Sequence, residues 1–558
     1  MKKLTNHLCL LYFLAMNMWA GAAPPDTITL NWLEKAPIIH SGVSWGVPWA
    51  KSIVKKDQAF TLLNAEGKAL PLQTWPLATW PDGSVKWSGF ATVADSGDKG
   101  PFRLVYGKSK NPVVPVAVGQ TKNGFKISTG ALTCYLSSKG SFLVDSMVIG
   151  KRVVASKGRL VCVLEDRSGL EKEGTVRYEN FTGSIKKVSI EQLGPVRAVV
   201  KIEGMHQSNQ GSREWLPFYV RFYFYAGQQE VRMVHSIVFD GDEKRDFISG
   251  LGVVFSVPMQ EEIQNRHVRF SGEGNGLWSE PVQPLIGRGR RIVSNSGKGD
   301  VFADQVSGKR VPDKAEVDQM SQHLMDSWAV WNDFKLVQPN ADGFSIVKRT
   351  NPLSSWLPVG SGNGRRSSGL AFVGDVSEGL GMGIRNFWQS YPASLEVRHA
   401  GAKEAELTAW LWSPDAPAMD LRHYDTVAHG LEEVYEDVQP GFSTPVGIAR
   451  TSEIMMFPGS GIPAKIVTAD QAITTNNPPL LVCTPQYLHS VKALGIWSLP
   501  DRSTPFKQQV EDNLDDAITY YKKSVEQNHW FGFWNYGDVM HSYDDVRHEW
   551  RYDLGGMA

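Results

Sequence analysis

Apolar and polar residues alternate in short runs from about residue 26 to residue 110, and turn signals separate the runs. Alternation of this kind is typical of strands that bury one face. The segments 64–67 (Asn-Ala-Glu-Gly) and 81–83 (Pro-Asp-Gly) are typical of tight turns between such strands. The pattern predicts a small all-β domain over 26–110, closed into a barrel and followed by a proline-spaced linker.

The strand pattern continues from about residue 119 to residue 470, without the alternating helices of a doubly wound fold. Strands at regular spacing favour a large antiparallel β-sandwich with long loops. We interpret the polar segment 287–322 as one of these loops. The glycine-rich segment 360–366 is interpreted as a flexible basic loop that could face a substrate.

The pattern becomes helical near residue 505, inside a domain that we expect to begin near residue 475. Thr504 can cap a helix that has Pro505 at its first position. Apolar side chains then recur at helical spacing: Phe506, Val510, Leu514, Ile518, Tyr521 and Val525. This predicts a helix over 505–526. Because one amphipathic helix cannot bury its apolar stripe alone, we expect the domain over 475–558 to be incomplete.

Composition adds two constraints. The chain has 558 residues, too many for one core, and carries 58 basic and 58 acidic side chains. A net charge of zero argues against binding of nucleic acid or another polyanion through the overall electrostatic field of the protein. Any anion must therefore be recognised by a local group of side chains. The 19 tryptophans favour carbohydrate binding, although sheet cores ordinarily account for most of them.

The N-terminus has the three parts of a signal peptide: Lys2 and Lys3, an apolar run over 8–19, and small residues over 20–23. Cleavage is expected after Ala22. No later apolar run is long enough to span a bilayer. We therefore expect a secreted or periplasmic protein without a membrane span.

Of the four cysteines, Cys134, Cys162 and Cys483 lie beyond the signal peptide and show no metal-ligand spacing. Their apolar surroundings favour buried free thiols, with a Cys134–Cys162 bridge as the alternative.

The segment 530–558 gathers aromatic residues, histidines, arginines and carboxylates with few aliphatic residues to make a core. Aromatic rings stack on pyranoses, guanidinium groups hold carboxylates, and histidine or tyrosine moves protons. This combination suits a sugar acid.

Four segments resemble the exo-acting rhamnogalacturonan lyases and YetA-like proteins, a family similar to polysaccharide lyase family 26. They are WPDGSVKW (80–87), 216–248, 379–397 and 531–556. The resemblance implies an N-terminal RIFT-type β-barrel, a central antiparallel β-sandwich and the start of a C-terminal α/α toroid. This order agrees with the strand and helix patterns. In the family the toroid continues further, so this chain is expected to be C-terminally truncated.

The resemblance implies β-elimination on a uronate-containing pectin backbone, rhamnogalacturonan I, from a chain end. Such a lyase neutralises the uronate carboxylate, removes the C5 proton and protonates the leaving oxygen. The candidates for proton transfer are His541, Tyr543, His548 and Tyr552. Arg551, and less readily Arg547, would hold the carboxylate.

We assign sugar contacts to Trp534, Asn535 and Tyr536. Arg385, Trp388 and Tyr391 could form the facing wall of the same cleft. The structural alternative is that the histidines are ordinary loop residues and that Trp388 packs between domains. No cofactor is expected. Asp240, Asp242 and Asp246 could hold Ca²⁺, but their spacing departs from that of an EF-hand.

Two other functions stay open. One is a non-catalytic carbohydrate-binding remnant of such an enzyme. The other is a glycoside hydrolase that uses a carboxylate pair among Asp538, Asp544, Asp545 and Glu549.

Overall fold

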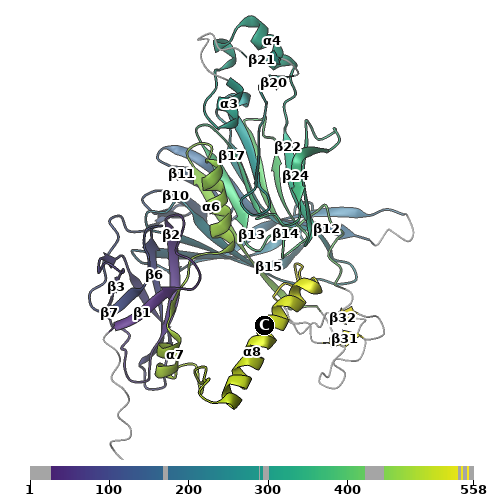
Figure 1. Ribbon diagram of the computed structural model, residues 1–558. Helices are drawn as coiled ribbons and strands as arrows, with labels where there is room; N and C mark the ends of the chain where they lie inside the picture. The colour runs from purple at the N-terminus through teal and green to yellow at the C-terminus, as the bar shows by residue number, and fades with distance from the viewer. Residues whose placement is uncertain are drawn as a thin grey trace, which may run out of the picture. The chain divides into compact units, whose positions relative to one another are not determined.

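The computed structural model describes residues 27–167, 174–286, 292, 301–421 and 445–537, and the backbone of 287, 290–291, 542–544 and 549–551. The described residues form mostly β-strands with few helices (Figure 1). The predicted signal peptide lies outside them. The chain divides into two compact units, one made of residues 1–36, 43–111 and 479–501 and the other of 37–42, 112–478 and 502–558.

The first unit is the predicted small β-barrel domain. Its strands form a five-stranded sheet in the order β30-β1-β7-β3-β4 and a three-stranded sheet in the order β2-β6-β5. The strands are β1 (Thr27–Trp32), β2 (Ser41–Pro48), β3 (Phe60–Leu63), β4 (Ala69–Leu70), β5 (Gln73–Thr79), β6 (Val85–Ala94), β7 (Phe102–Tyr106) and β30 (Leu481–Cys483).

Both predicted hairpin turns are confirmed. The Gly67 N–H donates to the Asn64 carbonyl oxygen at 2.9 Å, and Gly67 has the positive φ of 80° that favours glycine. The Trp80 N–H donates to the Ser84 oxygen at 2.8 Å and closes the β5–β6 hairpin. Apolar alternation flanks both turns, so local chemistry and buried faces favour the same register.

Residues 479–501 belong to the same compact unit as these barrel strands. Strand β30 pairs with β1, and helix α7 (Pro485–Val491) places Tyr487 in the core of the unit. The Tyr487 hydroxyl donates to the Pro48 oxygen at 2.7 Å. A segment remote in sequence therefore contributes an edge strand and a core side chain to this unit.

The second unit is the predicted antiparallel β-sandwich, wound around one large apolar core. Its strands are β8 (Ala117–Thr121), β9 (Gly124–Ser128), β10 (Thr133–Ser137), β11 (Val144–Ile149), β12 (Arg152–Asp166), β13 (Arg177–Gln192), β14 (Arg197–Ser208), β15 (Glu214–Tyr225), β16 (Val231–Val238), β17 (Phe247–Pro258), β18 (Arg266–Ser271), β19 (Leu277–Pro281), β22 (Asp333–Asn340), β23 (Gly343–Arg349), β24 (Leu357–Gly364), β25 (Leu370–Asp375), β26 (Gly379–Ile384), β27 (Ala393–Arg398), β28 (Glu404–Trp412) and β29 (Ala449–Gly459).

Alternate side chains of these strands fill the core. In β15, Phe218, Val220 and Phe222 are buried, while the residues between them are half-buried. Helix α6 (Lys465–Asn476), which Figure 1 labels, packs on strands β18, β19, β25, β26 and β29. In strands such as β15, the period-two pattern of the sequence thus corresponds to one face of the strand packed against the core.

Two loop interpretations are wrong. The segment 287–322 contains β21 (Arg290–Arg291), α3 (Val301–Val306) and the start of α4 (Gln319–Ser327), and β20 (Ile286–Gly287) overlaps its first residue. They surround a small apolar core of Leu285, Ile292, Val301, Val311, Val317 and Met325. These apolar residues are too sparse to show a period. The segment 360–366 belongs largely to strand β24, which pairs with β23.

The predicted long helix is confirmed as α8 (Pro505–Gln527). The Lys507 N–H donates to the Thr504 Oγ1 at 3.3 Å, as the capping signal predicts. Within α8, all of whose residues the structure describes, Ser524 alone is buried. The apolar stripe is exposed, with Phe506 at 75% and Leu514 at 56%. No helix in the described parts of the chain is both long and apolar enough to cross a membrane.

The three cysteines of the described residues are free and buried, as we expected. Burial disfavours each thiolate and raises the pKa of the Cys483 thiol to about 12. These thiols therefore act as small apolar core groups.

Candidate functional site

The predicted residues Arg385, Trp388 and Tyr391 lie in the turn between β26 and β27. The turn is anchored from two sides. The Asn386 N–H donates to the Asn476 side-chain oxygen of α6 at 3.0 Å. Phe387 fills a space that exists because residue 369 is glycine, since a Cβ there would meet Phe387 at 2.1 Å.

The first residues of the predicted C-terminal wall lie directly against this turn. The Gly532 N–H donates to the Gln389 carbonyl oxygen at 2.7 Å, and the Phe533 N–H donates to the Tyr391 carbonyl oxygen at 2.8 Å. Gly532 has a φ of 133°, which favours glycine. Backbone pairing thus brings together two groups of predicted residues that are about 140 positions apart in the sequence.

Aromatic rings fill the contact between the two segments. Phe531 lies edge-on to Trp388 at 4.9 Å and stacks with Tyr536 at 6.2 Å. Phe533 lies edge-on to Trp534 at 5.1 Å. Trp388 therefore packs against the segment 531–536, while Tyr536 and Trp534 stay half-buried.

Tyr391 and Asn535 flank Gly532 and present polar atoms there. A Cβ at Gly532 would lie 3.8 Å from Tyr391 Cζ and 3.8 Å from Asn535 Nδ2. Burial raises the pKa of Tyr391, so the phenol stays protonated at neutral pH and can donate a hydrogen bond or a proton.

Arg385 belongs to a cluster with a net positive charge. Its Nη1 lies 2.9 Å from Glu453 Oε1, and Arg232 Nη2 lies 2.7 Å from Glu453 Oε2. Two guanidinium groups thus share one carboxylate. The Arg385 Nε is buried and has no hydrogen-bond partner among the described residues. An anionic ligand group would balance the excess charge.

Two further arginines border the contact and were not assigned from the sequence. The Arg450 guanidinium lies 5.3 Å from the Phe533 ring and donates to Ser390 Oγ at 3.1 Å. Arg366 lies 4.0 Å over the Trp388 ring. Arg366 was signalled only by its place in the glycine-rich basic segment, and nothing in the sequence marks Arg450.

Arg366 also joins α8 to the sandwich. Its side chain pairs with Glu526 at 2.8 Å and with Asp342 at 3.0 Å. Partial burial would raise the pKa of Asp342, but hydrogen bonds and charges from Arg365 and Arg366 outweigh it, and the pKa lies below its ordinary value. His529 Nδ1 lies 3.2 Å from the same carboxylate. We call Asp342, Arg366, Glu526 and His529 the junction cluster.

Three of the five predicted catalytic residues, His541, His548 and Tyr552, lie outside the described residues, and so does the predicted substrate-binding Arg547. The backbones of Tyr543 and Arg551 are described. They belong to β31 (Ser542–Asp544) and β32 (Glu549–Arg551), which pair so that Arg551 is opposite Ser542. The roles of these six residues stay predictions.

The aspartates considered for Ca²⁺ bind protein donors instead. Asp246 Oδ2 accepts from Arg213 at 2.6 Å and from the Asp242 N–H at 2.8 Å, and Asp240 Oδ1 accepts from the Leu216 N–H at 2.7 Å. In the described parts of the chain, no group of three or more His, Cys, Asp and Glu residues could hold a metal ion.

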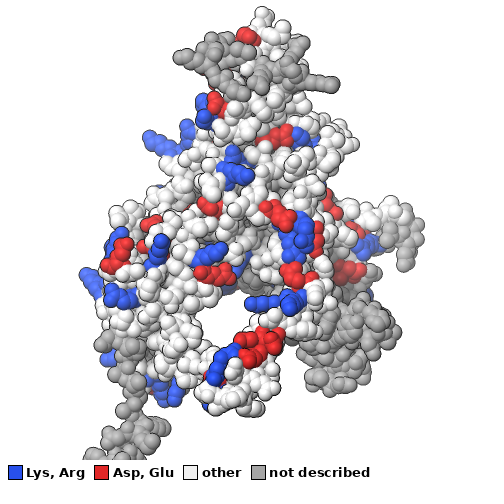
Figure 2. Space-filling model, in the orientation of Figure 1, with Lys and Arg blue, Asp and Glu red and all other residues white. Residues whose placement is uncertain are grey.

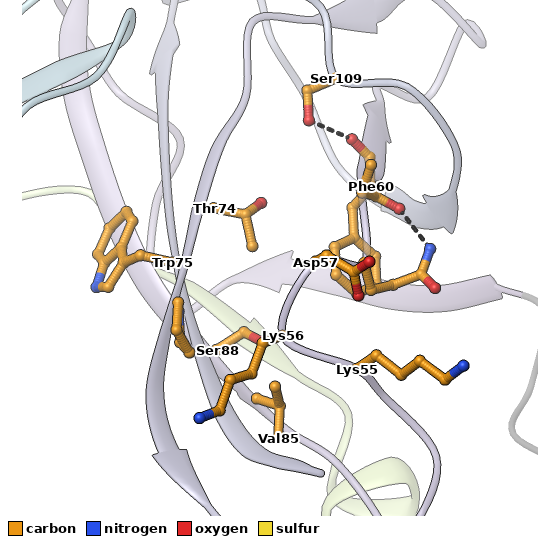
Figure 3. Close-up of a pocket in the computed structure, with 12 residues that line it drawn as sticks. Lys55, Lys56, Asp57, Phe60, Thr74, Trp75, Val85, Ser88 and Ser109 are labelled. Atoms are coloured by element: carbon orange, nitrogen blue, oxygen red, sulfur yellow. Dashed lines mark hydrogen bonds between the residues drawn. The ribbon is translucent and has the colours of Figure 1, made fainter. Parts of the chain in front are cut away.

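The barrel unit has a separate polar pocket of about 250 Å³ (Figure 3). Lys55, Lys56, Thr74 and Ser88 contribute to its lining, and the indole of Trp75 lies against Gly89. Its lining contains no His, Arg or Tyr. It therefore lacks the groups that the predicted chemistry requires.

Positive and negative side chains are interspersed over the face shown in Figure 2. This distribution agrees with the formal net charge of zero. It favours anion recognition by local clusters such as Arg232, Arg385 and Glu453.

Three family models match the chain in order. They are the PcRGLX-like N-terminal RIFT barrel domain over 26–107, the PcRGLX-like protein central beta sandwich domain over 116–472, and the PcRGLX-like protein C-terminal alpha/alpha toroid domain over 478–558. The chain belongs to the PcRGLX-like family. The expected RIFT-type barrel, β-sandwich and start of an α/α toroid are confirmed.

A relative supports this membership. The uncharacterized protein YetA of Bacillus subtilis (strain 168) is 39% identical over 529 residues, which cover 95% of this chain and 61% of that protein. The chain thus spans less than two thirds of the length of this relative.

Solved structures are more distant. An alpha-mannosidase from Enterococcus faecalis V583 is 10% identical with a TM-score of 0.44, covering 83% of this chain and 46% of that one. A protein in the glycosyl hydrolase family 38 from Enterococcus faecalis is 10% identical with a TM-score of 0.44, covering 83% of this chain and 48% of that one.

Proposed function

We propose that this protein is an exported polysaccharide lyase that cleaves the rhamnogalacturonan I backbone of pectin by β-elimination from a chain end. The observation that carries the proposal is the pairing of 532–533 with 389–391, because it joins the two groups of residues predicted to bind a sugar acid. Membership in the PcRGLX-like family supports the same class.

The reaction has three requirements. The uronate carboxylate must be neutralised, the C5 proton must pass to a base, and the leaving oxygen at C4 must receive a proton as the C4–O bond breaks. The product carries a C4–C5 double bond. No step requires a metal if cations and proton donors are in place.

We assign the carboxylate to Arg551, with Arg547 as the second choice, because a guanidinium binds carboxylates bidentately. Proton transfer is assigned to His541 or Tyr543, with His548 and Tyr552 as competing groups. The half-buried Tyr536, Trp534 and Asn535 would contact sugar rings. Tyr391 would donate a hydrogen bond to the sugar from the facing turn.

The charge cluster of the sandwich has a supporting role in this scheme. Arg385 and Arg232 share the single carboxylate of Glu453, which leaves one positive charge for a neighbouring uronate. The N-terminal segment 1–22 would direct the protein out of the cytoplasm. Pectin is an extracellular polymer, so export would bring the protein to its substrate.

The test follows the ultraviolet absorbance of the conjugated C4–C5 double bond during incubation with rhamnogalacturonan I. Rising absorbance supports the lyase. New reducing ends without absorbance would instead identify a glycoside hydrolase, and binding without either product would identify a carbohydrate-binding protein.

The variants Arg551→Ala and His541→Ala are expected to lower the rate of absorbance increase at least 100-fold. The matched control is His489→Ala, which removes an exposed histidine of α7 and should keep the wild-type rate. Wild-type turnover in both site variants would overturn the residue assignment.

A further inference from the structure

Trp410 of β28 lies flat on the sandwich strand β17. A Cβ at Gly252 would come within 2.8 Å of the Trp410 ring, and a Cβ at Gly250 within 3.2 Å, so two glycines make the space for the indole. The indole N–H donates to Glu396 Oε2 at 3.1 Å. Because one face of the ring covers the glycines and the residue is only half-buried, the other face points away from the strand.

A second indole, Trp356, lies in the connection before β24 and is also half-buried. Three cations approach its ring: Lys335 at 4.4 Å, Arg349 at 4.5 Å and Arg398 at 5.3 Å. Attraction between a cation and the ring quadrupole holds such groups in place. Buried Asp333 fixes the guanidinium of Arg349 at 2.8 Å.

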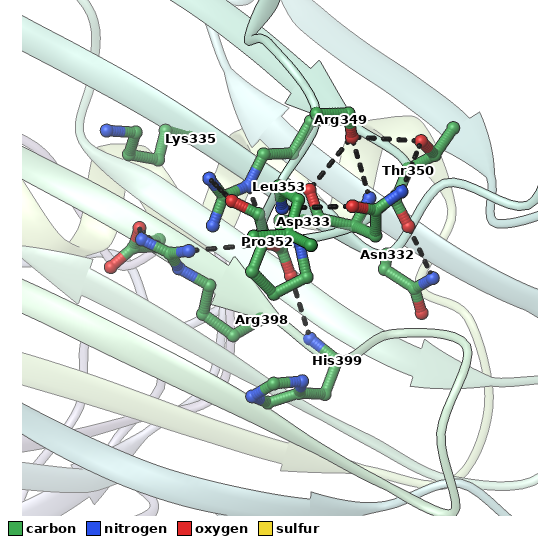
Figure 4. A network of polar contacts seen from close by, with 12 residues as sticks. Asn332, Asp333, Lys335, Arg349, Thr350, Pro352, Leu353, Arg398 and His399 are labelled. Carbon is green, nitrogen blue, oxygen red and sulfur yellow. Dashed lines mark hydrogen bonds and ion pairs between the residues drawn. The ribbon is translucent and has the colours of Figure 1, made fainter.

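A polar row connects the two indoles. Lys335 of β22 is directly opposite Glu396 of β27. Glu396 Oε1 pairs with Arg398 Nη2 at 2.5 Å while its other oxygen accepts from Trp410. Lys335 also pairs with Asp415. Figure 4 shows Lys335, Arg349 and Arg398 with their charged ends turned to the same side of the strands.

We propose that the surface made of Trp356, Trp410, Arg398 and Asp415 is a binding subsite for pyranose units of an acidic polysaccharide. The side chains of Lys335 and Glu396 are buried and hold these groups in place. Flat indole faces stack on pyranose rings. The partly exposed Arg398 can donate to hydroxyl and carboxylate oxygens, and the exposed carboxylate of Asp415 can accept from hydroxyl groups. We call it the tryptophan subsite.

The tryptophan subsite is continuous with the candidate site along β28. Two residues after Trp410, or about 7 Å along the strand, Trp412 lies edge-on to Phe533 at 5.6 Å. A bound chain of several sugar units could therefore contact both places. The subsite rests on the proposed function for the identity of its polysaccharide, but its geometry is independent of the catalytic assignment.

The experiment measures the affinity of the full chain for soluble rhamnogalacturonan I and for polygalacturonate by affinity electrophoresis. Trp410→Ala and Trp356→Ala should each weaken binding about tenfold, and Trp410→Phe, which keeps a smaller ring, should weaken it less. The control is Trp80→Ala, which removes a half-buried indole of the barrel that also carries a lysine, Lys86, at 4.7 Å. It should bind as the wild type does.

The outcomes separate the subsite from the enzyme. Wild-type affinity in both alanine variants, or no binding of either polysaccharide by the wild type, would overturn the tryptophan subsite. Weakened binding in those variants together with no unsaturated product from the wild type would overturn the proposed function and leave the subsite standing. Stronger binding by Trp410→Phe than by Trp410→Ala would show that the alanine variant lost a ring contact and did not simply fail to fold.

Discussion

Helix α8 and the segment 530–537 follow each other in the chain, and both are rich in apolar residues, yet their surroundings differ. In α8 the apolar stripe faces solvent, with Ile518 at 55% exposure. In the following segment Phe531 and Phe533 are both 3% exposed. The difference lies in the partner, since among the described residues only the second segment packs on a surface that buries its apolar side chains.

That surface consists of the turn between β26 and β27. It offers the carbonyl oxygens of Gln389 and Tyr391 to the amides of Gly532 and Phe533, and the ring of Trp388 to Phe531. Helix α8 satisfies its own backbone and needs no such acceptors. A helix can therefore form at a place where its side chains are unburied, whereas an irregular segment is ordered by what it contacts.

The largest expected effect comes from removing the ring that anchors the segment. Phe533→Ala deletes a buried ring that contacts Trp412 and Trp534. It should destabilise the packed segment by about 3–5 kcal/mol. Hydrogen exchange of the Gly532 and Phe533 amides would measure the loss of protection. Phe506→Ala on α8 is the control, and equal protection loss in both variants would contradict the contrast between the two regions.

Acid should act on the buried interior of the sandwich. Burial lowers the pKa of His206 from 6.5 to about 4, so the folded protein keeps this ring neutral. Between those values the unfolded chain binds more protons, and stability falls as the pH falls through that window. The loss should reach about 3 kcal/mol.

Urea unfolding followed by tryptophan fluorescence at pH 7, 5.5 and 4 would measure this loss. His206→Asn should reduce the dependence on pH without abolishing it, because burial also lowers the pKa of His235 and of His267 to about 3. His489→Ala on the exposed face of α7 should leave the dependence unchanged. A midpoint that stays constant from pH 7 to pH 4 in the wild type would exclude the mechanism.

A smaller effect is expected where the two regions meet. Arg366→Ala removes the ion pairs to Glu526 and Asp342 and the contact with Trp388, and should cost about 1–2 kcal/mol after screening of the exposed partner. Faster exchange of the amides in 524–531 would report it. Arg366→Lys should give an intermediate value, because an ammonium keeps the charge without the planar fork.

The same junction cluster should respond to acid. The pKa of Asp342 is lowered in the fold, so its contribution is present above the ordinary aspartate pKa and is lost as the pH falls below it. If the amides of 524–531 exchange at the same rate in Arg366→Ala and in the wild type at neutral pH, the junction cluster does not hold α8.

The smallest effect is expected on the stripe of α8 itself. Leu514→Gln replaces a side chain that is 56% exposed. The free energy of unfolding should therefore change by less than about 0.5 kcal/mol, and the melting temperature should stay close to that of the wild type. Binding of a hydrophobic dye should fall in the same variant. A clear drop in melting temperature would show that the stripe is buried in solution and would remove the contrast with 530–537.

Local chemistry made several features predictable from sequence. The Asn64–Gly67 turn needs only a glycine at positive φ, and α8 needs only a capping threonine and helical spacing. The strand order could not be predicted in this way. That β30 pairs with β1 depends on contacts between residues more than 400 positions apart, which no local pattern encodes.

The candidate site also has a part that could be predicted from local sequence and a part that could not. The residue types of 385–391 and 530–537 led us to predict both segments as sugar-acid binders, because that chemistry requires particular side chains, and the structure brings the two segments together. Arg232 and Glu453 lie in ordinary strand patterns, and only strand pairing brings them beside Arg385. Arg450, also in a strand, reaches Ser390 of the same turn. Trp410 likewise resembles any core tryptophan until Gly250 and Gly252 are seen beneath it.

The sequence by itself determined the order of barrel, sandwich and helix, and it carries the prediction of the site chemistry, since backbone preferences and side-chain types are local properties. It did not reveal the elements of 287–322 or the strand that includes 360–364. The tertiary structure alone decided which apolar surfaces are covered and which charged groups share a partner. Burial and ion pairing depend on what lies across the fold, and in this chain the same apolar content is buried in Phe533 and exposed in Leu514.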